Sequence, residues 1–155
     1  MYNVHQDLIN ALRATPDTLT ALLTGVSQEE ARSAKGGDEG WSVAEVLCHL
    51  RDTEEFSIQR VTLMRDQENP DLIPFDQEQL AVTRNYTAED MHAALFAFIR
   101  SRQQYVAILE ALPTESWERP GNHLEAGQIT IFSYVLHIAA HDAVHCAQIA
   151  RQLSE

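Results

Sequence analysis

The stretch WSVAEVLCHLRDTEEFSIQRVTLMRDQ, residues 41–67, decides the predicted fold class because it has the pattern of a long, capped helix. Ser42 is followed three positions later by Glu45, which is the arrangement of a capping box at a helix N-terminus. Apolar residues then recur at helical spacing to about Gln67. The two prolines of the following ENPDLIP cannot continue a helix. We therefore expect one long helix here, in the first half of the chain.

Three more helices are expected around it. Leucines near the start of the chain predict a helix that is interrupted at ATPDT, where Thr15 would act as a cap and Pro16 would take the first helical position. A third helix is expected from Thr87 to just before Pro113, and a fourth over about 128–153. Strand-like alternation is scarce along the whole sequence. The predicted fold class is all-α.

Four long helices favour a four-helix bundle, and we expect a single domain over 1–155 because no repeat, linker or low-complexity segment divides the chain. A Gly-bearing connector at 24–41 could contain a short turn over 28–32. The connectors at about 68–86 and 112–127 are long for simple hairpins, so at least one is expected to cross the end of the bundle. Each of these two could carry part of a functional site.

Composition excludes several classes of partner. The net charge is -12, with 23 acidic against 11 basic residues, and Lys35 is the only lysine. Such a surface repels nucleic-acid backbones and anionic lipid, so neither nucleic acid nor membrane is expected as a partner. No run of residues resembles a signal peptide or a membrane span. Cys48 and Cys146 do not form a disulfide framework, so a cytoplasmic location is expected.

The stretch HIAAHDAVHCAQIARQL, residues 137–153, carries three of the seven histidines, at His137, His141 and His145. Residues four apart lie one turn above each other on a helix, so two of these imidazoles could bind one metal ion. Three in a row drift by about 80°, which makes it hard for all of them to share one ion. We therefore expect two ligands from this helix and a third from another helix. The alternative is a helix whose histidines are surface or core residues without a metal.

Four other histidines are candidates for the third ligand. His49 is the best placed, because it lies in the capped helix between Leu47 and Leu50 on the side expected to face inward. A buried imidazole there needs a partner. The remaining candidates are His5, His92 and His123, which lie at the N-terminus, early in the third helix and in a Gly-bearing loop. Cys48 and Cys146 adjoin His49 and His145, but point about 100° away on their helices and are expected to be buried apolar residues.

The stretches WSVAEVLCHLRDTEEF and HIAAHDAVHCAQI, together with RPGNHLEAGQIT before the last helix, resemble the DinB/YfiT-like family of small metal-binding helical proteins. The resemblance spans nearly the whole chain. It implies a four-helix bundle with up-down-down-up connections. It also implies a metal site formed by His49, His141 and His145, with His137 left as a residue near the site or lining its cavity. Homodimerisation is a further expectation from the family.

Three neutral imidazoles leave the ion its double charge and at least one open position, which is the pattern of catalytic rather than structural sites. Zinc, nickel or ferrous iron would accept these nitrogens. The open position could hold water or a substrate thiolate. Three further residues are candidates for supporting the ligands or lining the cavity: Asp52, Gln148 and Arg60. Arginines such as Arg60 could also bind a carboxylate of a cofactor or substrate.

Two functional hypotheses follow. The first is a metal-dependent enzyme acting on a small molecule. For this enzyme, the family resemblance implies thiol S-transfer with a low-molecular-weight thiol such as bacillithiol or mycothiol, with metal-assisted hydrolysis as the neighbouring option. The second is a non-enzymatic metal-binding module with a role in stress response or binding. A closed site with a fourth protein ligand would favour the second hypothesis, and an open cavity beside the histidines would favour the first.

Overall fold

The computed structural model describes residues 1–33 and 40–154, so the middle of the predicted connector at 24–41 lies outside the described residues. The four long helices are α1 (Val4–Leu23), α3 (Val43–Asp66), α5 (Met91–Glu110) and α6 (Ile131–Ser154). Shorter elements join them: α2 (Gln28–Ser33), α4 (Gln77–Thr83), the 3-10 turns η1 (Tyr86–Ala88) and η2 (Thr114–Glu118), and the strands β1 (Pro120–His123) and β2 (Gly127–Thr130). The predicted all-α four-helix bundle is confirmed.

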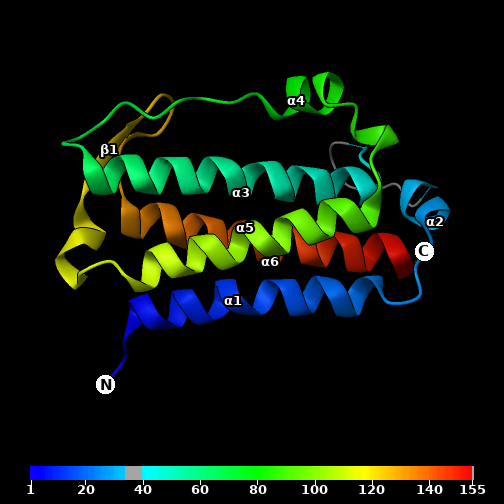
Figure 1. Cartoon of the computed structure of the whole chain (residues 1–155), viewed down its shortest axis with the longest axis horizontal. Helices are drawn as coiled ribbons and strands as arrows, with labels where there is room; N and C mark the ends of the chain where they lie inside the picture. The colour runs from blue at the N-terminus through cyan, green and yellow to red at the C-terminus, as the bar shows by residue number, and fades with distance from the viewer. Residues whose placement is uncertain (34–39, 155) are drawn as a thin grey trace.

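The bundle has up-down-down-up connections. Helices α3 and α5 run in the same direction, and the chain between them returns along the full length of the bundle before α5 begins (Figure 1). Each of α1 and α3 packs against both α5 and α6, so α1 and α3 lie diagonally across the bundle. The expected crossover is therefore the segment between α3 and α5, which contains α4. Within the described residues no helix is both long and apolar enough to cross a bilayer.

The capping box at the start of α3 forms as predicted. The Glu45 backbone N–H donates to the Ser42 hydroxyl, and the Ser42 backbone N–H donates to the Glu45 carboxylate, both at 3.2 Å. This pair satisfies two backbone donors that the first helical turn leaves without partners. The start of α3, and with it the position of His49 in the second turn, is thereby fixed by local sequence.

The prediction that the first helix is interrupted at ATPDT is wrong, because α1 continues through Pro16. A proline inside a helix leaves the carbonyl four residues earlier without its N–H donor. Here that carbonyl belongs to Leu12, and it accepts a hydrogen bond from the Arg102 guanidinium instead (Nη1 to O, 2.9 Å). Thr15 does not cap a helix. Its hydroxyl donates to the Asp142 carboxylate at 2.7 Å.

These contacts belong to a buried polar network that joins all four long helices. Arg102 of α5 forms ion pairs with Glu54 of α3 and Asp142 of α6, the latter through Nη1–Oδ2 and Nη2–Oδ1 distances of 2.6 and 3.1 Å. Arg102 and Glu54 are each 1% exposed, and Asp142 is 4% exposed. On each long helix, the residue that belongs to this network (Thr15, Glu54, Arg102 or Asp142) lies between apolar residues of one core cluster and apolar residues of the other. The network therefore separates the two halves of the apolar core.

Two other boundaries differ from the prediction. Helix α5 begins at Met91 rather than Thr87, because the Asp90 side chain caps it by accepting from the Ala93 N–H at 2.8 Å. The last helix begins at Ile131 rather than at 128, because 120–130 form an antiparallel hairpin. The hairpin is held against the end of α3 by the Arg119 guanidinium, which donates to the Met64 and Gln67 carbonyls.

Replacing Arg102 with Met is expected to lower the free energy of unfolding by about 3–5 kcal/mol, because two carboxylates would stay buried without their cation. The Leu12 carbonyl would also lose its donor. Urea denaturation of the purified variant measures this change.

Arg100 provides the matched control, since it is an exposed arginine on the same helix. Arg100→Met is expected to change stability by no more than about 0.5 kcal/mol. Equal stability of Arg102→Met and the unaltered protein would contradict the role given to the buried network.

Candidate metal centre

Three imidazole nitrogens converge between α3 and α6. His49 Nε2 lies 2.9 Å from His141 Nε2, which in turn lies 3.1 Å from His145 Nε2. One nitrogen from each ring lies within 4.8 Å of the other two. His49 and His145 are buried and His141 is half-buried. The structure thus brings together one histidine from α3 and two from α6.

The secondary structure explains why these three meet. The direction of α6 is opposite to that of α3, so the second turn of α3 lies beside the second half of α6 (Figure 1). His141 and His145 are one turn apart and face the same side of α6. Their neighbour Asp142 points to the bundle interior, where it pairs with Arg102. That ion pair sets the rotation of α6 and so directs both histidines toward α3.

Hydrogen bonding fixes the tautomer of His145. Its Nδ1 lies 2.8 Å from Gln148 Oε1, one turn further along α6. An amide oxygen only accepts, so His145 carries its proton on Nδ1 and presents the lone pair of Nε2 to the other two rings. A histidine ligand whose other nitrogen donates to an oxygen is the usual arrangement in metal sites.

Hydrogen bonds among the rings cannot satisfy all three converging nitrogens. His145 Nε2 carries a lone pair and can only accept a hydrogen bond. His141 Nε2 can carry one proton, and that proton can be donated to His49 or to His145 but not to both. His141 Nδ1 is also buried and has no hydrogen-bond partner among the described residues. A cation bound by the three Nε2 atoms would satisfy every lone pair at once.

The protonation states and the spacing both fit a metal ion. Burial, together with the neighbouring histidines, lowers the pKa of His141 to about 2 and that of His49 to about 4, so both rings are neutral at physiological pH. Two nitrogens on one tetrahedral zinc ion would lie about 3.4 Å apart. The observed separations of 2.9 and 3.1 Å are close to that value.

A cavity of about 650 Å³ opens beside the imidazoles. One wall is α3, a second is α6, and the rest comes from the crossover after α3 and the turn of the hairpin. Its lining residues are His49, Thr53, Arg60, Pro74, Phe75, Gln77, His123, Leu124, Glu125, Ala126, Ile129, Ser133, Tyr134, His137, Ile138 and His141. This volume lies in the range of pockets for small-molecule ligands. A substrate held there would lie against His49 and His141.

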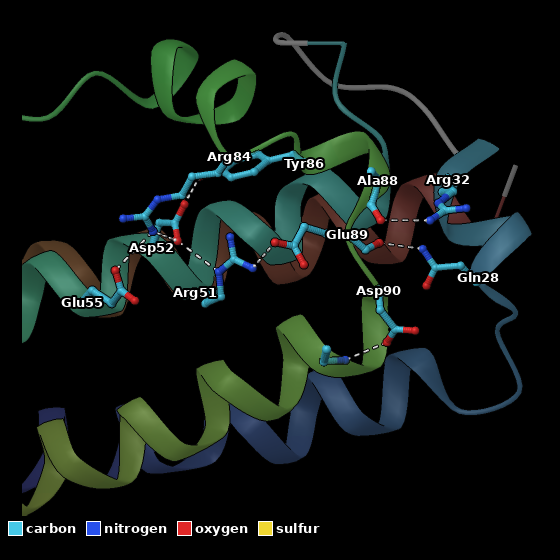
Figure 2. A network of polar contacts seen from close by, with 11 residues as sticks. Gln28, Arg32, Arg51, Asp52, Glu55, Arg84, Tyr86, Ala88, Glu89 and Asp90 are labelled. Carbon is cyan, nitrogen blue, oxygen red and sulfur yellow. Dashed lines mark hydrogen bonds and ion pairs between the residues drawn. The ribbon is translucent and has the colours of Figure 1, made fainter.

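The four predicted supporting residues take different positions. Gln148 contacts His145 as described, and His137 lines the cavity with its ring centroid 6.2 Å from that of His141. Arg60 also lines the cavity, three helical turns from His49 along α3. Asp52 instead accepts hydrogen bonds from its neighbour Arg51 on α3 and from Arg84 and Tyr86, and the last two fasten the end of the crossover to α3 (Figure 2).

The other histidines and both cysteines lie outside the cluster. His5 stacks on Trp117 with ring centroids 4.2 Å apart, and His92 is exposed on α5. His123 lines the cavity, but its Nδ1 accepts from two backbone N–H groups of the hairpin turn. Burial raises the pKa of Cys48 to about 12 and that of Cys146 to about 11, so both thiols are protonated at neutral pH.

Several residues that line the cavity are not among those predicted from the sequence. Thr53 lies one turn after His49, and its buried hydroxyl has no hydrogen-bond partner in the described part of the chain. The four-residue spacing from His49 could have indicated it. Tyr134 and Phe75 carry no such signal, and the turn of the hairpin could not be placed because the hairpin itself was not predicted.

Comparison with known proteins identifies the family. The model of the DinB superfamily matches residues 11–149, which include the three clustered histidines. The chain belongs to the DinB superfamily.

Similar proteins share a provisional name, and the solved structure of one similar protein has a similar fold. A protein of Oceanobacillus iheyensis, provisionally named a metal-dependent hydrolase, is 27% identical over 142 residues, or 91% of this chain and 81% of the relative. A Geobacillus kaustophilus protein with the same provisional name is 24% identical over 146 residues, or 94% and 82% of the two chains. The solved structure of YfiT from Bacillus subtilis superimposes with a TM-score of 0.89 at 21% identity, covering 96% of this chain and 85% of that one. YfiT is described as having an unusual four-helix bundle topology.

The purified DinB-superfamily protein is expected to bind one divalent cation per chain, and His141→Ala is expected to abolish this binding. His141 is chosen because its Nε2 contacts both other rings. Elemental analysis after dialysis measures the bound metal. His92→Ala, an exposed histidine on α5, should leave the stoichiometry unchanged, whereas full metal retention by His141→Ala would refute the site.

Replacing Gln148 with Leu is expected to weaken metal binding by roughly 10–100-fold, because His145 would lose the acceptor that fixes its tautomer and orientation. Competition with a chelator measures the affinity. Gln103→Leu, an exposed glutamine on α5, is the matched control. An affinity unchanged in Gln148→Leu would show that this hydrogen bond does not support metal binding.

Proposed function

We propose that this protein is a metal-dependent enzyme in which His49, His141 and His145 bind one divalent cation and the adjoining cavity binds a small-molecule substrate. The observation that carries the proposal is the open cavity beside the three clustered imidazoles, two of which, those of His49 and His141, line it. A site that serves only folding is closed by a fourth protein ligand. Among the described residues, no further His, Cys, Asp or Glu joins the cluster.

The reaction proposed first is hydrolysis, because the relatives in Oceanobacillus and Geobacillus carry that provisional name. A divalent cation bound by three neutral histidines retains its double charge and lowers the pKa of a coordinated nucleophile such as water or a thiol. Zinc, nickel and ferrous iron all accept imidazole nitrogens. The same charge would stabilise a thiolate, so S-transfer from a low-molecular-weight thiol is the second candidate reaction.

The chain's own residues have defined parts in this proposal. His145 is held by Gln148, and His49 is held by the capped start of α3 and by packing against Trp41, whose ring centroid is 5.2 Å away. Both ligands therefore stand on rigid elements, as a preorganised site requires. Tyr134 and Phe75 provide apolar surface along the cavity, which excludes water from the substrate.

Substituting His145 with Ala is expected to reduce turnover to the background rate, because two imidazoles bind a cation far less well than three. The assay uses the metal-saturated protein with a panel of activated esters and amides, with and without an added low-molecular-weight thiol. Val144→Ala, an exposed neighbour on the same helix, is the control and should retain activity.

Melting temperatures of the same variants, measured with and without added metal, distinguish an enzyme from a non-enzymatic binding module when they are compared with the turnover rates. A binding module would show no turnover in any variant, and His145→Ala would only lose the increase in melting temperature that added metal produces. Activity that survives in His145→Ala with full metal content would refute the proposed role of His145 as a metal ligand, and absence of turnover in every variant would refute the proposed enzyme.

A further inference from the structure

The end of the cavity away from the histidines contains an arginine without an acidic partner. Arg60 is 7% exposed and lines the cavity. Its Nη2 donates to the Ile73 carbonyl at 2.9 Å, while its buried Nε–H has no acceptor among the described residues. No carboxylate in 1–33 or 40–154 lies within ion-pair distance of this guanidinium. Burying a permanently charged guanidinium without a counter-charge costs free energy, and an anionic ligand would lower that cost.

Aromatic side chains hold the guanidinium in place. Its central carbon lies 5.2 Å from the ring centroid of Phe75 and 5.7 Å from that of Tyr134. Phe75 is itself stacked on Phe56 at 4.1 Å. These contacts fix the plane of the guanidinium fork, so binding an anion would require little ordering of the side chain. The contrast is Arg102, the buried arginine whose charge is met by two carboxylates.

The arginine and the metal cluster lie on one face of α3. Arg60 follows His49 by 11 residues, which is three turns and a rise of about 16 Å. Tyr134 and His141 line the opposite wall on α6 in the same order along the cavity. The cavity thus has a cation-binding end and a guanidinium end, joined by a largely apolar middle. Glu125, on the exposed hairpin turn, is the only carboxylate among the cavity-lining residues that the structure describes.

We propose that Arg60 binds a carboxylate of the substrate, so that the enzyme acts on an elongated monoanion whose reactive group lies at the histidines and whose carboxylate lies at Arg60. A planar guanidinium pairs with a carboxylate through two parallel hydrogen bonds. One arginine carries one positive charge, which matches a single carboxylate. This inference rests on the proposed function, because it assigns the substrate class of the same cavity.

The test compares two probes that differ only at one end. Mercaptohexanoate and mercaptohexanamide both offer a thiol to the cation, but only the first carries a carboxylate. Calorimetric titration of the zinc-saturated protein is expected to show that mercaptohexanoate binds at least about tenfold more tightly than mercaptohexanamide, which is the usual contribution of hydrogen bonds to a charged group. Equal affinities for the two probes would overturn the proposal.

Substitutions of Arg60 test whether this side chain causes the difference in affinity between the two probes. Arg60→Gln is expected to reduce the affinity for mercaptohexanoate to that of the amide while leaving the amide unchanged. Arg60→Lys retains the positive charge but lacks the planar guanidinium, so it should keep part of the higher affinity for mercaptohexanoate. This variant replaces Arg60→Gln in the test if Arg60→Gln does not fold. Arg100→Gln is the matched control. An equal loss for both probes in Arg60→Gln would show a purely structural role and refute carboxylate binding.

Probes without a thiol separate this inference from the proposed function. Hexanoate should bind more tightly than hexanamide, and this difference should depend on Arg60. The result is expected even if the metal does not increase the affinity for thiols and thiol transfer is refuted. If hexanoate still binds more tightly than hexanamide in Arg60→Gln, the carboxylate binds to the cation. That result would overturn the role of Arg60 and support the metal site.

Discussion

The buried guanidinium of Arg102 is the interaction on which the arrangement of the bundle depends. It contacts a carboxylate on α3, a carboxylate on α6 and a backbone carbonyl on α1, so a single side chain of α5 reaches each of the other long helices. Apolar packing alone tolerates small rotations and shifts of helices. A buried ion network is far less tolerant, because any displacement leaves a charge without its partner. The network therefore specifies one relative placement of the four helices.

That placement is what the histidine cluster requires. Asp142 and His141 are adjacent on α6, and residues next to each other on a helix point about 100° apart. When Asp142 turns inward to Arg102, His141 is directed toward α3 and meets His49. The convergence of the three histidines is thus a consequence of the core. His141 Nε2 can lie about 3 Å from the Nε2 atoms of both His49 and His145 because the network fixes the rotation of the helices beneath them.

Local signals were the part of the structure that sequence could predict. The capping box of Ser42 and Glu45 and the spacing of His141 and His145 operate within one or two helical turns, and both appear as expected. The continuity of α1 through Pro16 depends on Arg102, 86 positions later in the chain, so no local pattern could indicate it. The hairpin at 120–130 was missed because its strands have only four residues each and are stabilised by contacts to the end of α3. The side chains that shape the cavity come from four separate segments, which only the tertiary structure brings together.

The cavity has walls of two kinds, and this division has an evolutionary consequence. The clustered histidines and Arg60 stand on α3 and α6, whose positions the core fixes, whereas Phe75, Gln77 and 123–126 come from the crossover and the hairpin turn. Insertions and substitutions in such connecting segments are tolerated far better than changes within packed helices. In the proposed enzyme, exchanging these two segments would change the substrate preference and leave the histidine end of the pocket unchanged.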